Sequence, residues 1–177
     1  MARRPVFLSF YYEEDVFRLH QIKNMGAIER QPILSANDFE EIRLKGPTAV
    51  KKWIDDNMRY KRCLIVLIGR NTSSRPWVQY EIKKAWDDKK SMFGIYIHNL
   101  ECPKSGYCAK GANPFDVLGS KISGRIDCYD PNLYSFDSLF DPDLTKGKIV
   151  YKEISKNLES WIENAIEKRN MIDMFGI

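Results

Sequence analysis

The stretch Arg62-Cys-Leu-Ile-Val-Leu-Ile-Gly69 decides the fold, because it is a continuous apolar run that ends in glycine. Such a run is typical of a strand that is buried on both faces of a parallel sheet. A helical pattern follows within a few residues, in Ser74-Arg-Pro-Trp-Val-Gln-Tyr-Glu-Ile82. Ser73 or Ser74 can cap that helix, with Pro76 in its first turn. The sequence therefore predicts a buried strand that leads directly into a helix.

The predicted helix carries two kinds of side chain on neighbouring faces. Val78, Ile82 and Ala85 recur at i, i+4 and i+7 and form the core stripe. Trp77 and Glu81, which are also four residues apart, share the adjacent face. Because doubly wound folds bind ligands beyond the carboxyl ends of their strands, we expect both residues to line that crevice. The spacing is equally consistent with a surface glutamate beside a half-buried tryptophan.

Apolar segments and helical patterns alternate on both sides of this unit, which favours an α/β fold with a parallel sheet covered on both faces. Further strands are predicted at 6–10, more weakly at Ile33-Leu34, at 92–97 and at 126–129. Helices are predicted after the first strand, near 47–58 and at 147–169. Residues 36–45, 99–121 and 129–146 are predicted to be loops, and a long loop inside a compact domain is usually functional.

The last helix has the clearest pattern in the chain and completes the expected domain. Its apolar residues should pack one face on the sheet: Val150, Ile154, Leu158, Trp161 and Ala165. Since 177 residues suit one domain of ordinary size, we expect a single domain over 1–177, with a core over about 5–130.

The composition is that of an ordinary folded protein and narrows the expected partners. The chain is 44% apolar and 29% charged, with a net charge of +4. Its basic residues are spread among acidic ones, so neither nucleic acid nor a membrane is predicted as a partner. We find no signal peptide and no apolar run of spanning length, and expect a cytoplasmic protein. The 4 cysteines and 2 histidines lack the spacing of a zinc site, which predicts free thiols and no metal.

The familiar signatures of nucleotide-binding proteins and hydrolases are absent from the sequence. The chain contains neither G-x-G-x-x-G nor G-x-x-x-x-G-K-[ST], and it has no G-x-S-x-G. A carboxylate pair can be drawn from Glu81 with Asp15 or Asp38, although sequence gives no distance between them. A phosphoacceptor or flavin-binding protein is a further alternative. The predicted central strand ends in Gly69-Arg70, however, without the carboxylate that a phosphoacceptor needs at that position.

Two of these segments resemble the motifs of TIR domains. Val6-Phe-Leu-Ser-Phe10 is similar to the first strand, and Trp77-Val-Gln-Tyr-Glu81 to the W-x-x-x-E pattern of the NAD-consuming branch. More narrowly, residues 5–120 resemble the TIR-like family of the ThsB proteins of bacterial Thoeris anti-phage defence. Three features carry this match: Val66-Leu-Ile-Gly69 running on to Trp77-Val-Gln-Tyr-Glu-Ile82, Gly94-Ile-Tyr-Ile97, and Lys110-Gly-Ala-Asn-Pro-Phe-Asp-Val-Leu-Gly119.

The resemblance implies a fold and a reaction. The fold is a flavodoxin-like, three-layer domain around a mostly parallel sheet of about five strands. The reaction is cleavage of the nicotinamide-ribose bond of NAD, which serves as the substrate and not as a cofactor, followed by formation of a cyclic ADP-ribose isomer. That product would act as a diffusible signal to an effector protein.

The resemblance also assigns site residues by position. Glu81 matches the catalytic glutamate. The implied substrate-binding residues are Ser9, Phe10 and Tyr11 at the edge of the first strand, Asp38 in the loop after the second strand, and Trp77. One carboxylate is sufficient for such a reaction, because nicotinamide is already a cationic leaving group and the barrier lies in stabilising positive charge on the ribose.

A non-catalytic reading of the same residues stays open. Many TIR domains act as interaction modules that assemble partners, and an intact Glu81 is compatible with that role. Trp77 can be a packing residue, and Ser9 a small residue that permits close packing. The sequence also leaves open whether the protein forms a homo-oligomer that completes the site.

Overall fold

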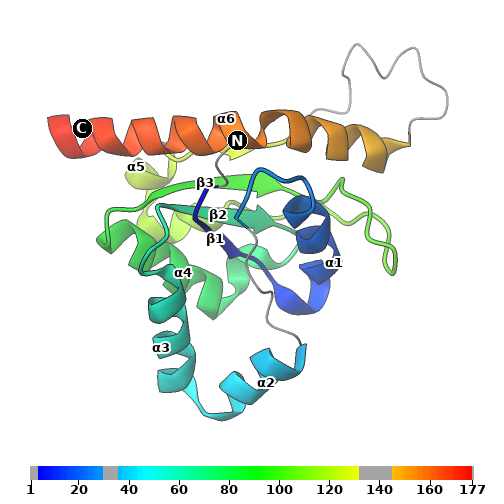
Figure 1. The fold of residues 1–177 in the computed structure, drawn as a ribbon, viewed down its shortest axis with the longest axis horizontal. Coiled ribbons are helices and arrows are strands. Elements are labelled where there is room, and N and C mark those ends of the chain that lie inside the picture. The colour runs from blue at the N-terminus through cyan, green and yellow to red at the C-terminus, as the bar shows by residue number, and fades with distance from the viewer. Residues whose placement is uncertain (1–3, 30–35, 132–144, 177) are drawn as a thin grey trace.

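The computed structural model describes residues 4–29, 36–131 and 145–176 (Figure 1). Its strands are β1 (Val6–Ser9), β2 (Cys63–Ile68), β3 (Ser91–Tyr96) and β4 (Cys128–Tyr129). Its α-helices are α1 (Tyr12–Lys23), α2 (Ala36–Leu44), α3 (Pro47–Met58), α4 (Pro76–Asp87), α5 (Ser120–Ser123) and α6 (Lys146–Phe175). Two short 3-10 helices, η1 (Thr72–Ser74) and η2 (Pro114–Leu118), precede α4 and α5.

The strands form one parallel sheet in the order β1-β2-β3-β4. Cys63 at the start of β2 pairs with Val6 on one side and with Ser91 on the other, so β2 is an inner strand. All six residues of β2 are buried, which confirms the buried parallel strand that the sequence predicts. Since parallel neighbours need crossover connections, the helices between the strands are placed against the faces of the sheet.

The described sheet has four strands, whereas the sequence predicts about five. The weak candidate at Ile33-Leu34 lies outside the described residues. Just before it, the Glu29 N–H donates to the Arg4 carbonyl over 3.1 Å, and Arg4 and Ile28 form an isolated parallel bridge. The chain that leads into this candidate therefore runs beside the start of β1.

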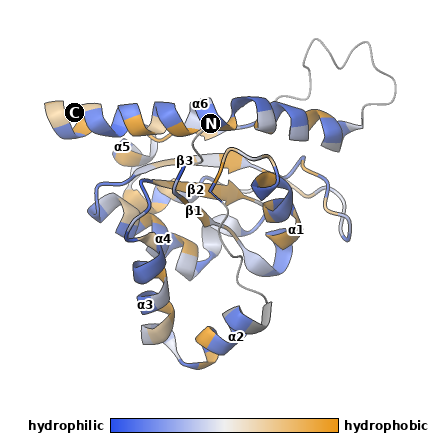
Figure 2. Ribbon diagram, viewed as in Figure 1, coloured by the Kyte–Doolittle hydropathy of each residue, from blue (hydrophilic) through white to orange (hydrophobic). Residues whose placement is uncertain are grey.

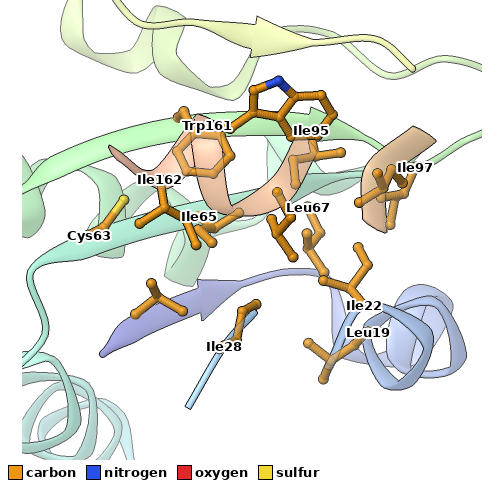
Figure 3. Packing of buried hydrophobic residues seen from close by; sticks show 14 of the residues in the cluster. Leu19, Ile22, Ile28, Cys63, Ile65, Leu67, Ile95, Ile97, Trp161 and Ile162 are labelled. Carbon is orange, nitrogen blue, oxygen red and sulfur yellow. The ribbon is translucent and has the colours of Figure 1, made fainter. Parts of the chain in front are cut away.

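One face of the sheet packs on α1 and α6 (Figure 3). Leu19 and Ile22 of α1 and Trp161 and Ile162 of α6 meet around Ile65 of β2 in a single apolar cluster. The predicted stripe of the last helix is confirmed, because all five of its residues belong to this cluster. The helix itself is longer than the predicted 147–169.

The opposite face of the sheet packs on α3 and α4 (Figure 1). The second cluster joins Phe7 of β1 to three residues of α3 and to the α4 stripe, namely Val50, Ile54, Met58, Val78, Ile82 and Ala85. Hydrophobic colour is concentrated in the strands between the two helical layers (Figure 2). The fold is thus a three-layer, flavodoxin-like α/β arrangement, as predicted.

The prediction that residues 36–45 form a polar loop is wrong. Most of this segment forms the helix α2. This helix has no strong apolar stripe to reveal it. Ion pairs one turn apart support it instead: Lys45 lies 2.9 Å from Glu41, and Arg43 lies 3.3 Å from Glu40. Ile42 packs against the cluster formed by α3 and α4.

Two further local predictions need correction. Neither Ser73 nor Ser74 caps α4, because both belong to η1 and Arg75 occupies the cap position. Pro76 does begin the helix, and it has no N–H that needs a cap. The predicted loop 99–121 contains η2 and the start of α5, and most of the predicted irregular stretch 129–146 lies outside the described residues.

No helix in the described parts of the chain is both long enough and apolar enough to span a membrane.

Candidate active site

A cavity of about 310 Å³ lies at the carboxyl end of β1, where the chain turns into α1. This volume falls within the range of small-molecule sites. β1 and the turn after it supply Phe7, Leu8, Phe10 and Tyr11 to the lining. The first three helices supply Tyr12, Glu13, Leu19 and Lys23 of α1, Arg43 of α2, and Trp53 and Asn57 of α3. The rest comes from α4 and its cap residue, with Arg75, Pro76, Trp77, Val78 and Glu81.

Glu81 is the buried carboxyl group of this cavity, with 9% of the residue exposed. The Ser9 hydroxyl donates a hydrogen bond to its Oε2 atom. Burial raises the pKa of Glu81 from 4.5 to about 8, and the Ser9 hydrogen bond opposes that rise. Among the described residues, no cation pairs with this carboxyl group. Glu81 is therefore an acid that is largely protonated at neutral pH until a ligand changes its surroundings.

The Ser9 and Glu81 side chains meet because of strand and helix periodicity. Phe7 packs on the face of the sheet that α3 and α4 cover. Ser9, two residues later, points to that same face and is 1% exposed. On α4, Val78 and Ile82 pack against the sheet, so the adjacent face with Glu81 is directed toward the end of β1. A serine, unlike a larger residue, leaves room for the carboxyl group there.

Aromatic side chains form much of the cavity wall around Glu81. Trp77 lies one helical turn before Glu81 and meets Tyr80 edge-on, with ring centroids 6.1 Å apart. On the opposite side, Phe10 packs on Tyr12 at 6.0 Å. Trp77, Phe10 and Tyr11 all line the cavity. The structure therefore brings together with Glu81 four of the five residues that the resemblance assigns to substrate binding.

Asp38 is the exception among the predicted residues. It lies on α2, is exposed, and is not one of the residues that line the cavity. The side chain that α2 contributes to the lining is instead Arg43. Arg43 lies 3.9 Å from Glu13 of α1, another lining residue. This ion pair connects α2 to the mouth of the cavity.

Sequence reasoning did not single out the basic residues of the cavity. Arg75 lies in the segment 74–82, but its spacing in the sequence indicates no role for it. Its guanidinium group lies over the Tyr11 ring, 4.4 Å from the centroid. Burial lowers the pKa of Lys23. Arg43 gave no signal, because the segment 36–45 was predicted to be a loop. The positions of these cations around Trp77 and Glu81 become informative only when the fold is known.

The described residues hold no group of three or more His, Cys, Asp or Glu side chains able to bind a metal ion. The four cysteines of the chain all lie in described segments and are free thiols, as predicted. Cys63 is buried in β2, and burial raises the pKa of its thiol to about 12.

Comparison with known proteins identifies the family. Residues 7–102, more than half of the 177, match the family model described as the Thoeris protein ThsB, TIR-like domain. The chain belongs to this TIR-like family. A relative from Bacillus cereus (strain MSX-D12) carries the name "Putative cyclic ADP-D-ribose synthase ThsB1" and is 31% identical over 128 residues. The match covers 70% of this chain and 66% of that relative, slightly less than two thirds of its length.

Proposed function

We propose that this protein cleaves the nicotinamide-ribose bond of NAD and converts the ADP-ribose part into a cyclic product. One observation carries the proposal. The Glu81 carboxyl group is buried in a cavity lined by aromatic side chains, and it accepts a hydrogen bond from the Ser9 hydroxyl. The relative from Bacillus cereus is named for cyclic ADP-ribose synthesis, which supports the same reaction. Glu81 is the proposed catalytic residue, and Ser9, Phe10, Tyr11 and Trp77 are proposed to contact the substrate.

The chemistry of Glu81 follows from its surroundings. The nicotinamide ring of NAD is cationic, and a cation beside a buried carboxyl group favours the ionised form. Substrate binding therefore promotes loss of the proton from Glu81. The carboxylate then accepts hydrogen bonds from ribose hydroxyls and stabilises the positive charge that develops on the ribose as nicotinamide leaves. Ser9 keeps the carboxyl group oriented toward the substrate.

Exclusion of water determines the product. After nicotinamide leaves, the anomeric carbon reacts with the first nucleophile that reaches it. The Phe10, Tyr11 and Trp77 side chains reduce access of water to that carbon. A nucleophile of the same molecule then closes a ring and gives cyclic ADP-ribose, whereas attack by water gives linear ADP-ribose.

The wider role is proposed from the family and from the relative's name. The cyclic product would diffuse to an effector protein during anti-phage defence in the bacterial cytoplasm. NAD is the substrate, and the scheme needs no separate cofactor or metal ion. The whole chain, 1–177, is proposed to act as one TIR-like domain. A homo-oligomer is compatible with this scheme, and nucleic acid and membrane play no part in it.

The decisive experiment compares wild type with Glu81→Gln, which keeps the size of the side chain but removes its charge. Nicotinamide release from NAD should fall by about 100- to 1,000-fold or more in the variant. Wild type should yield a product one water lighter than linear ADP-ribose by mass spectrometry. Glu167→Gln is the matched control, because Glu167 is exposed on α6 on the other side of the sheet, and it should retain wild-type turnover.

The alternative function, a non-catalytic interaction module, makes the opposite prediction. In that case wild type and Glu81→Gln would both fail to release nicotinamide, and the variant would keep full partner binding. Nicotinamide release should be measured in phage-infected cells as well as with purified protein, so that an enzyme awaiting activation is distinguished from a scaffold. Absence of Glu81-dependent turnover in both settings would contradict the proposal.

A further inference from the structure

The cavity contains one acid and one cation that no opposite charge balances among the described residues. One is Glu81, whose partner is the neutral Ser9 hydroxyl. The other is Arg75, whose Nε donates to the Asn71 carbonyl over 3.2 Å and whose Nη2 donates to Ser74 Oγ over 3.1 Å. Neither acceptor of Arg75 is a carboxylate. A ligand that favours the ionised form of Glu81 and also pairs with Arg75 must therefore carry a positive and a negative charge.

Two other arginines of the chain are already paired. Arg43, the other arginine of the lining, lies 3.9 Å from Glu13 and 3.3 Å from Glu40. Arg18 of α1 is 2.8 Å from Asp15, with the side chains of both residues buried. Arg75 differs from both, because within the described residues it lines the cavity without a salt bridge. Its positive charge is available to an anionic ligand.

The position of the Arg75 guanidinium is fixed by contact with Tyr11. The guanidinium carbon lies 4.4 Å from the centroid of the Tyr11 ring, which is a cation-π arrangement. Both residues line the cavity. Such stacking fixes the plane of the guanidinium while its edge remains able to donate in pairs to phosphate oxygens. The Nη1 atom has no hydrogen-bond partner in the described structure.

We propose that Arg75 binds the diphosphate group of a dinucleotide in this cavity, with Tyr11 as its positioning residue. This assignment rests on the proposed function, because it takes NAD as the dinucleotide. Arg75 stands at the cap of α4 and Glu81 lies six residues later, so their backbones are roughly 9 Å apart along the helix axis. The cationic nicotinamide-ribose end then lies at Glu81 and the diphosphate at Arg75. The order of charges in the cavity matches the order of charges along the ligand.

The test measures binding without turnover. Isothermal titration calorimetry with ADP-ribose should show binding about 10- to 100-fold weaker for Arg75→Gln than for wild type, the usual effect of a charge-assisted hydrogen bond. Adenosine, which has no phosphate, should bind both proteins equally. Arg70→Gln is the matched control, because Arg70 is exposed five residues earlier and does not line the cavity. Arg75→Lys keeps the positive charge but loses the paired N–H donors of the guanidinium group. Its affinity for ADP-ribose should lie between those of wild type and Arg75→Gln.

Two results would overturn the assignment: equal ADP-ribose binding by wild type and Arg75→Gln, or a parallel loss of adenosine binding. The outcome is separable from that of the proposed function. If ADP-ribose binding depends on Arg75 but nicotinamide is never released, the diphosphate site stands and the enzymatic proposal fails. If nicotinamide is released but ADP-ribose binding does not depend on Arg75, the enzymatic proposal stands and the diphosphate site is overturned.

Discussion

Two buried carboxyl groups of this protein have raised pKa values for the same reason but differ in their partners. Asp15 on α1 is fully buried, and burial raises its pKa to about 6 although the neighbouring Arg18 lowers it. Glu81 on α4 is also buried, and burial raises its pKa to about 8, opposed by Ser9 alone. One acid has a permanent counter-ion, and the other faces a cavity with only a hydroxyl partner.

The partners of Arg18 show that the Asp15 group is structural. Arg18 is 2.8 Å from Asp15 Oδ1, and it also donates to the carbonyl groups of Leu100 and Gly106 at 2.8 and 2.7 Å. It thereby connects α1 to the segment after β3. Asp15 also packs so tightly on Gly69 that a Cβ atom there would collide with its carboxyl group. There is no space for a side chain between Gly69 and Asp15.

The comparison teaches how to separate a structural acid from a candidate catalytic one. A buried charge that is paired and hydrogen-bonded within the fold is stabilised in advance. A buried acid without a counter-ion, placed at a cavity, gains its stabilisation only from what binds there. The raised pKa alone does not distinguish them, whereas the identity of the partner does.

The largest expected effect is a loss of stability when the Asp15–Arg18 ion pair is broken. Arg18→Met should lower the free energy of unfolding by about 3 to 5 kcal/mol, because it leaves the Asp15 acid and two carbonyl groups without their partner. Urea unfolding measures this loss. Arg70→Met, at an exposed arginine, should change stability by less than about 0.5 kcal/mol. A loss below about 1 kcal/mol in Arg18→Met would show that this ion pair is not structural.

The next effect concerns stability as a function of pH. The pKa of Glu81 is about 8 in the folded protein, above its ordinary value of 4.5, so between these values the folded protein retains a proton that the unfolded chain has lost. Stability therefore falls as pH rises from about 4.5 to 8, by at most about 5 kcal/mol. Glu81→Gln lacks this decline.

Urea unfolding of wild type and Glu81→Gln at pH 5 and pH 8.5 measures the effect. The variant should gain stability relative to wild type as pH rises. The Asp15 group is present in both proteins, so its own contribution cancels. Parallel pH dependence of the two proteins would mean that Glu81 is not the high-pKa acid.

The smallest expected effect comes from Ser9→Ala. Its hydroxyl lowers the pKa of Glu81, so its removal should raise that pKa further above 8. If the carboxylate is the active form, kcat/KM of wild type rises with pH up to about 8. In the variant this rise in kcat/KM should occur at higher pH. At pH 7 we expect a loss of about tenfold, within the effect of one hydrogen bond to a charged group. If kcat/KM falls by the same amount but rises at the same pH as in wild type, Ser9 acts only through contact with the substrate.

Much of the fold was predictable because it depends on local periodicity. The apolar run Cys63–Ile68, the α4 stripe and the α6 stripe each repeat at the spacing of their element, and all are found where they were predicted. The α2 helix was missed because ion pairs and not an apolar stripe support it. Its weak pattern resembles that of an exposed loop.

The site was predictable in part, and the reason differs by residue. Trp77 and Glu81 lie four residues apart on one helix, so their shared face follows from sequence spacing. That Ser9 would bond to Glu81 could not be derived in this way, because 72 residues separate them. Arg43 reaches the cavity only through the placement of α2. Sequence distance carries no information about contacts of this kind.

The sequence by itself determined the order of the four described strands and of the helices with an apolar stripe, their buried faces and the face of α4 that carries Glu81, because these depend on periods of two and 3.6 residues. Only the tertiary structure decided that the Asp15–Arg18 pair of α1 is buried and that Glu81 lies at a cavity without a counter-ion among the described residues. Asp15 pairs with Arg18, which also donates to the segment after β3, while Glu81 meets Ser9 at the end of β1. The physical reason is that burial, and contacts such as that of Ser9 with Glu81, depend on distances between elements, which the crossover topology sets.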